Sequence, residues 1–297
     1  MSYTGIICID KPRGFTSFDV IAKLRGMLKT KKLGHSGTLD PLATGVLPVF
    51  AGNATRAVDM LSDNDKTYEA GFRLGVRSDT QDITGKLIYT DTPLPSADAV
   101  EKAVASFTGD IMQIPPMYSA VSVNGKRLYE LARKGIEVER EARPVTVYSA
   151  SLVSYDAGGE GSITFSCSKG TYVRTLINDI GDSFGCGAVM TSLRRTRACG
   201  FDIADCITLD ELRIMTDRED DISGLFRPVD KVFEDLPAIH LDERLTALYK
   251  NGVKLRDDVI GAESCDLYRV YGSDDGFIGI ARHDKDERVI RVRKNFF

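Results

Sequence analysis

Residues 67–74 carry an apolar or aromatic side chain at every second position, with polar, charged or glycine residues between them. This period of two is the pattern of a β-strand that buries one face. Alternation of the same kind at 145–155 and 162–168 predicts two further strands. Such strands must bury their apolar faces against other elements, so the chain is expected to fold around a sheet.

Helical patterns lie on either side of these strands. The first helix is predicted to begin at Ser17 as its N-cap, and others are expected from Ser96 and through Leu176. Apolar residues at three- and four-residue steps give the first helix one buried face: Phe18, Ile21, Leu24 and Leu28. Basic residues lie nearer solvent on this helix or directly after it: Lys23, Arg25, Lys29, Lys31 and Lys32. Such a run is usually a solvated helix face, and the alternative is a surface that binds nucleic acid.

The 297 residues have a formal net charge of -4 and an isoelectric point of about 5.6, which counts mildly against a nucleic-acid partner. Positive charge is concentrated locally, however, before residue 33 and again at Arg194, Arg195 and Arg197, where phosphates could be held. The N-terminus lacks a long apolar segment, and no apolar run approaches the roughly 18 residues of a membrane span. A cytoplasmic protein without membrane contact is therefore expected.

Neither the cysteines nor the histidines are spaced as metal ligands. The six cysteines show no CxxC spacing: Cys8, Cys167, Cys186, Cys199, Cys206 and Cys265. The three histidines form no cluster in the sequence: His35, His240 and His283. Buried free thiols and no bound metal are therefore expected.

A polar loop at 34–45 lies between the basic helix and an apolar run at 46–50 that is typical of a buried strand. Binding and catalytic residues are common in such loops. The proline after Asp40 keeps this aspartate out of helical geometry, and a loop aspartate is most often a turn former. The functional alternative is a carboxylate nucleophile or base. It needs a cation to stay ionised when a substrate excludes water, and Arg174 is the candidate.

Four other residues have both a structural and a functional interpretation. His35 could be a general base, but without a visible Ser or Asp partner a satisfied or solvent-facing histidine fits better. Tyr68 and Tyr172 would ordinarily be core residues, and Asp82 could cap its own loop or pair with an arginine. Tyrosines near a basic surface can also stack on flipped bases. The residues alone thus indicate an enzyme or an RNA-binding protein with an aspartate loop.

The run GHSGTLDPLATGVL at 34–47 closely resembles the signature of the TruB family of tRNA pseudouridine synthases. Further blocks match in the family's order: DKP at 10–12, FTS at 15–17, KTY at 66–68, LG at 74–75, DT at 79–80 with Asp82, PP at 115–116, YSA at 118–120, GTYVR at 170–174 and LRR at 193–195. The resemblance implies isomerisation of uridine 55 in the T-loop of tRNA to pseudouridine, without cofactor or metal. It also implies an α+β fold, with a mixed, largely antiparallel catalytic sheet flanked by helices and a small β-rich, PUA-like C-terminal domain.

The same resemblance assigns catalytic roles. Asp40 would be the nucleophile, attacking either the ribose C1′ or the base C6. Tyr68 would stack on the flipped uracil and is a candidate for proton transfer. Arg174 would pair with Asp40, and Asp82 with Arg174, a network that makes physical sense because a buried carboxylate without a cation would protonate.

Substrate-binding roles follow in the same way. Tyr172 and Leu193 would line the base pocket, and His35 would fill the gap left in the T-loop. Lys11, the basic helix and an insertion at about 112–136, which resembles the family's mobile thumb, would grip the RNA. Many relatives carry lysine at the position of Arg56. Arginine keeps the positive charge but contacts a phosphate with a different geometry. The expected partner is the T-stem-loop of tRNA, bound by a monomer that requires no protein partner.

The resemblance divides the chain into a catalytic domain at 1–235 and a PUA-like RNA-binding domain at 236–297. Two alternatives remain: a guide-RNA-dependent pseudouridine synthase that relies on partner proteins, and a non-catalytic tRNA-binding or folding protein. The insertion favours the stand-alone enzyme. The joint presence of Asp40, Tyr68 and Arg174 argues against the non-catalytic alternative.

Overall fold

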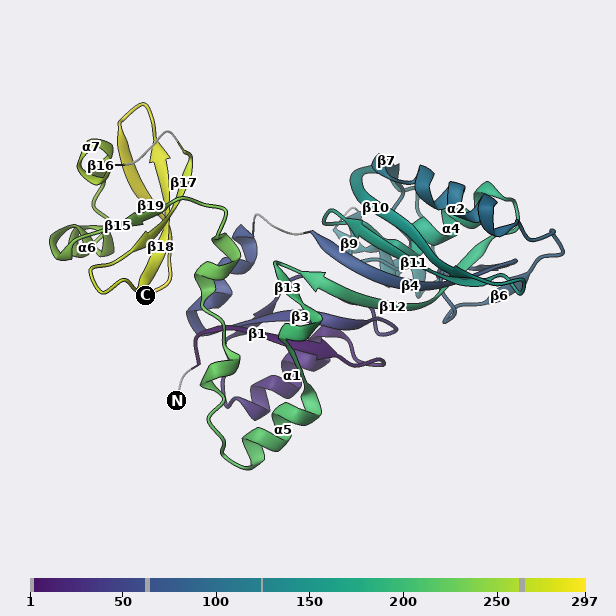
Figure 1. The fold of residues 1–297 in the computed structure, drawn as a ribbon, viewed down its shortest axis with the longest axis horizontal. Coiled ribbons are helices and arrows are strands. Elements are labelled where there is room, and N and C mark those ends of the chain that lie inside the picture. Colours follow the sequence, from purple (N-terminus) through teal and green to yellow (C-terminus); the bar gives the residue numbers. More distant parts are fainter. Residues whose placement is uncertain (1–2, 62–64, 124, 262–264) are drawn as a thin grey trace.

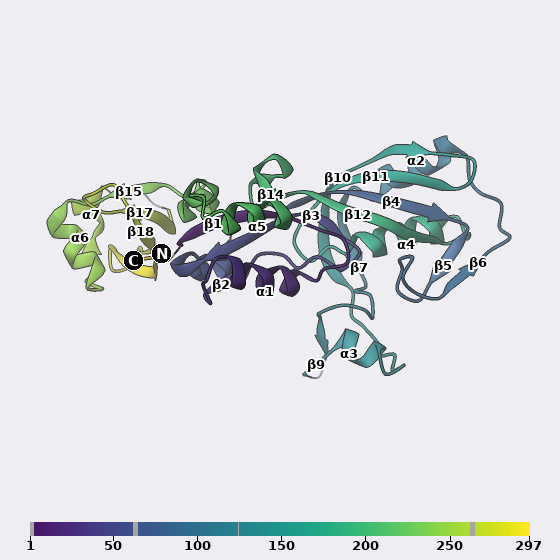
Figure 2. The same ribbon diagram turned by 90° about the horizontal axis from the view of Figure 1, so that it is seen from below.

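The computed structural model describes residues 3–61, 65–123, 125–261 and 265–297. The molecule is elongated, with a large sheet, a small β-rich domain at one end and a short hairpin-and-helix unit that projects from the sheet (Figure 1, Figure 2). The predicted α+β fold, with its mixed, largely antiparallel sheet and its small C-terminal β-rich domain, is confirmed.

The large sheet contains ten strands within the described residues: β1 (Gly5–Lys11), β2 (Leu33–His35), β3 (Thr44–Ala51), β4 (Lys66–Leu74), β7 (Gly109–Gln113), β10 (Arg143–Tyr155), β11 (Glu160–Cys167), β12 (Ala188–Ala198), β13 (Phe201–Asp202) and β14 (Cys206–Thr208). Their order is β14-β1-β3-β12-β4-β11-β10-β7, with β13 beside β12 and β2 beside β3. The pairs β1–β14 and β12–β3 are parallel, and the remaining pairs are antiparallel. A separate hairpin joins β5 (Val76–Ser78) to β6 (Leu87–Tyr89).

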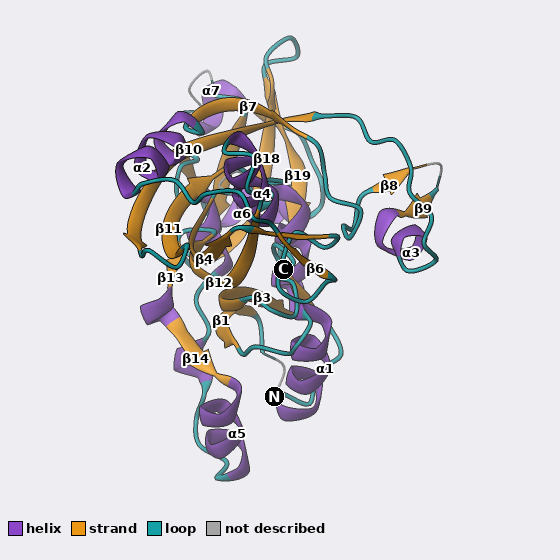
Figure 3. Ribbon diagram, turned by 90° about the vertical axis from the view of Figure 1, so that its right-hand side faces the viewer, coloured by secondary structure: helices purple, strands orange, loops and turns teal. Residues whose placement is uncertain are grey.

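Helices cover the two halves of this sheet separately (Figure 3). α1 (Ser17–Met27) and α5 (Leu209–Asp217) share a core with β1 and β3, whereas α2 (Ala97–Ser106) and α4 (Val173–Ser183) share one with β4, β11 and β12. Four 3-10 helices are η1 (Gly52–Met60), η2 (Ile203–Asp205), η3 (Ser223–Leu225) and η4 (Val229–Phe233). None of the described helices is long and apolar enough to cross a lipid bilayer.

The alternation that predicted β4 is confirmed by its burial. Tyr68, Ala70, Phe72 and Leu74 are buried, and the intervening residues reach solvent to varying degrees. β4 lies between β11 and β12 and is antiparallel to both. Its apolar face therefore becomes the centre of the core under α2 and α4.

The first helix differs from the prediction by one residue at its start. Thr16 is the N-cap and forms a capping box with Asp19, whereas Ser17 is the first helical residue and is buried. This shift turns Phe18 outward, where it is 65% exposed beneath the guanidinium of Arg25. Val20 takes the buried position instead.

Other elements also differ from the patterns in the sequence. The segment Gly52–Met60 forms the 3-10 helix η1, and the five-residue strand β7 was not predicted. All six cysteines lie in the described residues and remain thiols outside any disulfide; four are buried as expected, whereas Cys206 and Cys265 are partly exposed. Short elements carry too few residues for periodicity to identify them.

The insertion forms the unit that projects from the sheet in Figure 2. It contains β8 (Ser122–Val123), β9 (Lys126–Arg127) and α3 (Leu128–Ala132). The dipeptide Asn124-Gly125 is typical of a hairpin turn, and β8 and β9 pair as a hairpin, although Asn124 itself lies outside the described residues. Gly125 has a φ of +77° and Gly135, which ends the helical segment, has a φ of +69°, so both occupy the left-handed region that favours glycine.

The C-terminal domain contains a second sheet, in the order β15-β17-β18-β19-β16. Its elements are β15 (Ala238–His240), α6 (Glu243–Lys250), β16 (Leu255–Arg256), α7 (Asp257–Ile260), β17 (Leu267–Tyr271), β18 (Phe277–Asp284) and β19 (Val289–Asn295). Phe277 and Phe296 pack against Phe233 of η4, and Tyr271 Oη donates to Asp230 Oδ2 at 2.7 Å. Aromatic packing and hydrogen bonds therefore join this domain to the segment that leads into it.

Candidate active site

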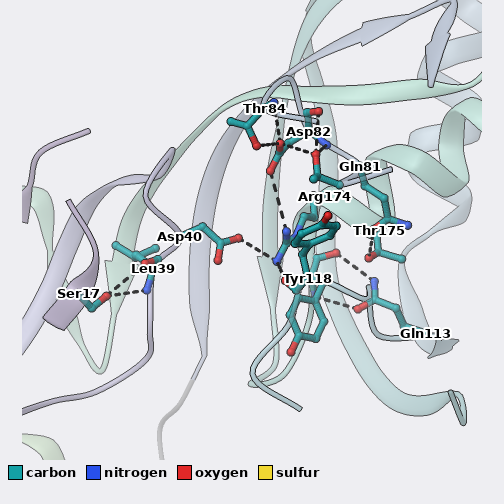
Figure 4. Close-up of polar contacts among 12 residues, drawn as sticks. Ser17, Leu39, Asp40, Gln81, Asp82, Thr84, Gln113, Tyr118, Arg174 and Thr175 are labelled. Carbon is teal, nitrogen blue, oxygen red and sulfur yellow. Dashed lines mark hydrogen bonds and ion pairs between the residues drawn. The ribbon is translucent and has the colours of Figure 1, made fainter. Parts of the chain in front are cut away.

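The loop that carries Asp40 joins β2 to β3, and hydrogen bonds hold its backbone on both sides of the aspartate. Ser17 Oγ, from the start of α1, accepts from Leu39 N at 2.9 Å and donates to Leu39 O at 3.3 Å (Figure 4). Gly14 N donates to Pro41 O at 2.8 Å, and Ala43 N donates to Asp40 O at 3.0 Å. The Asp40 side chain therefore projects from a backbone with little freedom to move.

A fully buried arginine, Arg195, holds the two ends of the same loop. Its Nε donates to Val46 O at 2.7 Å, and a terminal nitrogen donates to Gly37 O at 3.0 Å. At Gly45, where φ is +101°, a Cβ atom would lie 2.1 Å from Arg195 O, so only glycine fits this approach. From the sequence, Arg195 was expected to hold phosphates together with Arg194 and Arg197. That interpretation is wrong for Arg195, because β12 turns it inward.

Arg174 lies between two carboxylates, those of Asp40 and Asp82, as Figure 4 shows. Its Nη2 is 3.1 Å from Asp40 Oδ2, and its Nη1 is 4.0 Å from Asp82 Oδ2. Nη2 also donates to Tyr118 O, at the base of the insertion, at 2.6 Å. The structure thus brings together the three charged residues that the resemblance had linked.

Asp82 is held by the loop around it. Its Oδ1 accepts from Thr80 Oγ1 and from Thr84 N, both at 2.8 Å, and also from Thr84 Oγ1. These bonds occupy one carboxylate oxygen and leave Oδ2 on the side of Arg174. Asp82 therefore supplies a fixed negative charge beside the buried guanidinium.

The side chains of Asp40, Arg174 and Asp82 differ in their exposure to solvent. The Asp40 side chain is 41% exposed, whereas those of Arg174 and Asp82 are each 6% exposed. The buried Arg174 guanidinium, 3.1 Å from the Asp40 carboxylate, provides a positive charge that offsets the negative one. The arrangement can therefore present an anionic nucleophile or base to a substrate.

Aromatic and apolar residues lie beside this network. Tyr68 and Leu193 belong to the same buried cluster as Leu39 and Leu42 of the Asp40 loop. Burial raises the pKa of the Tyr68 phenol above its usual value of 10.0, and the nearby charge of Arg195 opposes this shift. The Tyr68 hydroxyl is therefore protonated at neutral pH.

Tyr172 is the N-cap residue of α4, two positions before Arg174, and its ring centroid lies 5.9 Å from the Arg174 guanidinium carbon. Its backbone N–H donates to Gln113 Oε1 at 2.8 Å, and its carbonyl accepts from Gln113 Nε2 at 3.1 Å. On the other side of this turn, Thr175 Oγ1 donates to Gln81 Oε1 at 2.7 Å. The turn that carries Arg174 is thus fixed from two directions.

Family comparison covers nearly the whole chain. Residues 25–173 match the TruB family pseudouridylate synthase N-terminal domain. The chain belongs to the TruB family. Two further TruB domains match in sequence order, the tRNA pseudouridylate synthase B C-terminal domain at 174–234 and the pseudouridine synthase II TruB C-terminal domain at 237–293.

Individual TruB relatives align along most of their length. The tRNA pseudouridine synthase B of Clostridium kluyveri is 43% identical over 93% of this chain and 94% of its own. The protein of the same name from Aromatoleum aromaticum is 44% identical over 94% of this chain and 89% of its own. Among solved structures, a Cbf5-Nop10-Gar1 complex contains a chain with a TM-score of 0.75 and 28% identity, covering 99% of this chain and 85% of that one.

Lys11, expected on the RNA-gripping surface of this TruB protein, is not at the surface. It is fully buried, and its Nζ donates to Pro12 O at 3.0 Å and to Phe15 O at 2.6 Å. Burial lowers the pKa of Lys11 to about 8. The expectation of a surface contact is wrong, because this ammonium holds the turn between β1 and α1.

His35 precedes β3 in the sequence and Arg56 follows it. His35, on β2, is half-buried, and burial together with the charge of Arg195 lowers its pKa, so the ring is neutral at physiological pH. Its Nδ1 finds no hydrogen-bond partner among the described residues. Arg56, on η1, donates to Asn295 O at 3.1 Å and to Asn295 Oδ1. Its guanidinium therefore connects the catalytic sheet to the C-terminal domain.

Sequence patterns missed three residues that support the site: Ser17, Gln113 and Arg195. Each acts through a contact with a residue that is distant in the chain. Alternation along β12 was the one available signal, since it places Leu193 and Arg195 on the same buried face. Nothing in the local sequence indicates the other two contacts.

Proposed function

We propose that this protein isomerises uridine 55 in the T-loop of tRNA to pseudouridine, with Asp40 as the nucleophile. The observation that carries the proposal is the accessible Asp40 carboxylate, 3.1 Å from the buried Arg174, in a chain 40–44% identical to tRNA pseudouridine synthases B. The reaction breaks the N1–C1′ bond and forms a C5–C1′ bond. N1 gains a proton, and C5 releases its own to solvent.

The geometry supports distinct roles around the extruded nucleotide. Asp40 attacks ribose C1′ or base C6, and Arg174 keeps it ionised once RNA excludes water. Tyr68 stacks on the uracil and, as a protonated phenol, is placed to exchange a proton with it. Tyr172 and Leu193 line the base pocket. Extruding a base costs a few kcal/mol, which contacts with the rest of the T-loop must offset.

RNA contacts are proposed for exposed basic residues outside the pocket. The basic residues on α1 and directly after it are all exposed: Lys23, Arg25, Lys29, Lys31 and Lys32. The insertion at 112–136 grips the RNA from the other side of the site, and His35 fills the gap in the T-loop. Residues 1–235 then act as the catalytic domain and 236–297 as a PUA-like RNA-binding domain, in a cytoplasmic monomer that needs no protein partner.

Tritium release tests this function directly. The purified protein alone is expected to release tritium from a T-stem-loop whose uridines are tritiated at C5, because C5 loses its hydrogen when the new bond forms. A T-stem-loop with cytidine in place of uridine 55 should release none, which serves as the control for position. Release only after a guide RNA or partner proteins are added would support the guided alternative. Binding without release under any condition would support the non-catalytic one.

Charge reversal at the basic surface should weaken RNA binding. Replacing both Lys31 and Lys32 by glutamate removes two exposed cations, so the slope of log Kd against log salt should fall by about 1 to 2. Filter binding to the T-stem-loop at several salt concentrations measures this slope. Replacing Lys86, in the loop before β6, and Lys102, on α2, by glutamate changes the net charge equally and is the matched control. An unchanged slope in the Lys31 and Lys32 variant would remove that surface from the interface.

A further inference from the structure

The side-chain amide of Gln113 makes two hydrogen bonds to the backbone of one distant residue. Gln113 is the last residue of β7 and is 2% exposed. Its Oε1 accepts from Tyr172 N at 2.8 Å, and its Nε2 donates to Tyr172 O at 3.1 Å (Figure 4). The amide therefore pairs with Tyr172 much as a neighbouring strand would.

Tyr172 needs such a partner because of its position at the start of α4. It is the N-cap residue, and no side-chain cap bond is present at this helix start. Its carbonyl already accepts from Thr175 N and Leu176 N, both at 3.1 Å, but a helix provides no acceptor for an N-cap N–H. The primary amide of Gln113 supplies both an acceptor for that N–H and a donor for that carbonyl, on two separate atoms.

The same turn carries the active-site arginine. Arg174 follows Tyr172 by two positions, and its Nη2 is shared between Asp40 Oδ2 at 3.1 Å and Tyr118 O at 2.6 Å. Gln113 and Tyr118 lie at the two ends of the segment that leads from β7 into the insertion. The base of the insertion therefore touches this turn at two points, one on the backbone and one on the guanidinium.

Gln81 contacts the turn from the opposite side but more weakly. Its side chain bonds to this turn once, as acceptor from the Thr175 hydroxyl at 2.7 Å. A hydroxyl can rotate to another acceptor, whereas a backbone N–H cannot. The two glutamines thus differ in how firmly they fix the position of Arg174.

We propose that Gln113 is a positioning residue for the isomerisation: it fixes the first turn of α4 against the base of the insertion and so sets the place of Tyr172 and Arg174 relative to Asp40. This inference rests on the proposed function, since it assumes that Asp40 and Arg174 serve the reaction. It goes beyond that function by making the rate of the chemical step depend on a side chain that touches neither the substrate nor the nucleophile.

Replacing Gln113 by methionine keeps the length of the side chain and removes both hydrogen bonds. The single-turnover rate of tritium release should fall by about 100-fold, the size expected when a catalytic group is misplaced by about 1 Å. The Kd for the T-stem-loop should change by less than about threefold, because Gln113 is buried and carries no phosphate contact. A selective loss of rate with binding retained is a result that general damage to the fold would not produce.

Two comparison variants complete the test. Gln113→Glu keeps the acceptor for Tyr172 N and loses the donor. Its single-turnover rate should therefore be about tenfold higher than that of Gln113→Met. Because Gln113→Glu keeps one of the two bonds, it can serve as the test variant if Gln113→Met folds poorly. Gln81→Met removes an amide from the other side of the turn and should cost less than about threefold in rate. Thermal melts establish that each variant is folded at the assay temperature.

Rates equal in Gln113→Met and Gln81→Met would overturn the proposal. A loss of rate matched by an equal loss of RNA binding, with no recovery in Gln113→Glu, would also overturn it. If the wild-type protein releases no tritium, the proposed function fails and the inference fails with it. If the wild type is active, Asp40→Asn is inactive and Gln113→Met behaves as wild type, only the positioning inference fails.

Discussion

Asp40→Asn is expected to release tritium from the T-stem-loop at least about 10⁴-fold more slowly than the wild type. The amide has almost the same shape as the carboxylate but cannot act as an anionic nucleophile. Since the Asp40 side chain is 41% exposed, the free energy of unfolding should change by less than about 1 kcal/mol. Single-turnover release, RNA binding and urea unfolding measure the three quantities.

Asp10→Asn is the matched control for this variant. Asp10 also pairs with an arginine, its Oδ2 lying 2.8 Å from Arg194 Nη2, but it belongs to β1 and not to the Asp40 loop. It should retain activity within about tenfold of the wild type, because a partly exposed ion pair contributes little. Equal release from Asp40→Asn and the wild type would show that Asp40 is not the nucleophile.

Arg195→Met should lower the free energy of unfolding by about 2 to 5 kcal/mol. Methionine fills much of the buried space but leaves the Val46 and Gly37 carbonyls without the guanidinium donors that reach them at 2.7 and 3.0 Å. Because these carbonyls mark the two ends of the Asp40 loop, the rate of tritium release should also fall, by about 100-fold. Urea unfolding and single-turnover assays test both effects.

Arg194→Met, at the adjacent position of β12, distinguishes the effect of losing a buried guanidinium from the effect of losing a positive charge. The Arg194 side chain is 39% exposed and pairs with Asp10, so its loss should cost less than about 1 kcal/mol. Both variants remove one positive charge from the same strand. Similar unfolding curves for the two would show that the Arg195 guanidinium does not hold the loop.

Local patterns in the sequence predicted the elements that depend on neighbours along the chain. The alternation around Tyr68 and Phe72 predicted β4, and Ser96 predicted the start of α2, which its side chain caps. In each case the deciding hydrogen bonds or burial repeat within a few residues, which is the range that periodicity and capping rules describe.

Most features that the sequence did not predict depend on contacts between residues that are distant in the chain. Ser17 resembles an N-cap in the sequence, yet its hydroxyl is used by Leu39, and Thr16 caps the helix instead. Lys11 is an exception, because the carbonyls of Pro12 and Phe15 that bind its buried ammonium are close in the chain, yet no periodicity or capping rule describes this contact. Gln113 has no local signal, because its partner Tyr172 is brought to it only by the folded sheet.

The packing between the two sheets has a consequence for how the chain folds. Ile6 and Phe50 of the large sheet share one buried cluster with Phe233 of η4 and with Ile280 and Phe296 of the C-terminal domain. Truncation before residue 236 would therefore leave part of the catalytic sheet's own core facing water. We therefore expect the C-terminal domain and the large sheet to unfold together in one cooperative transition.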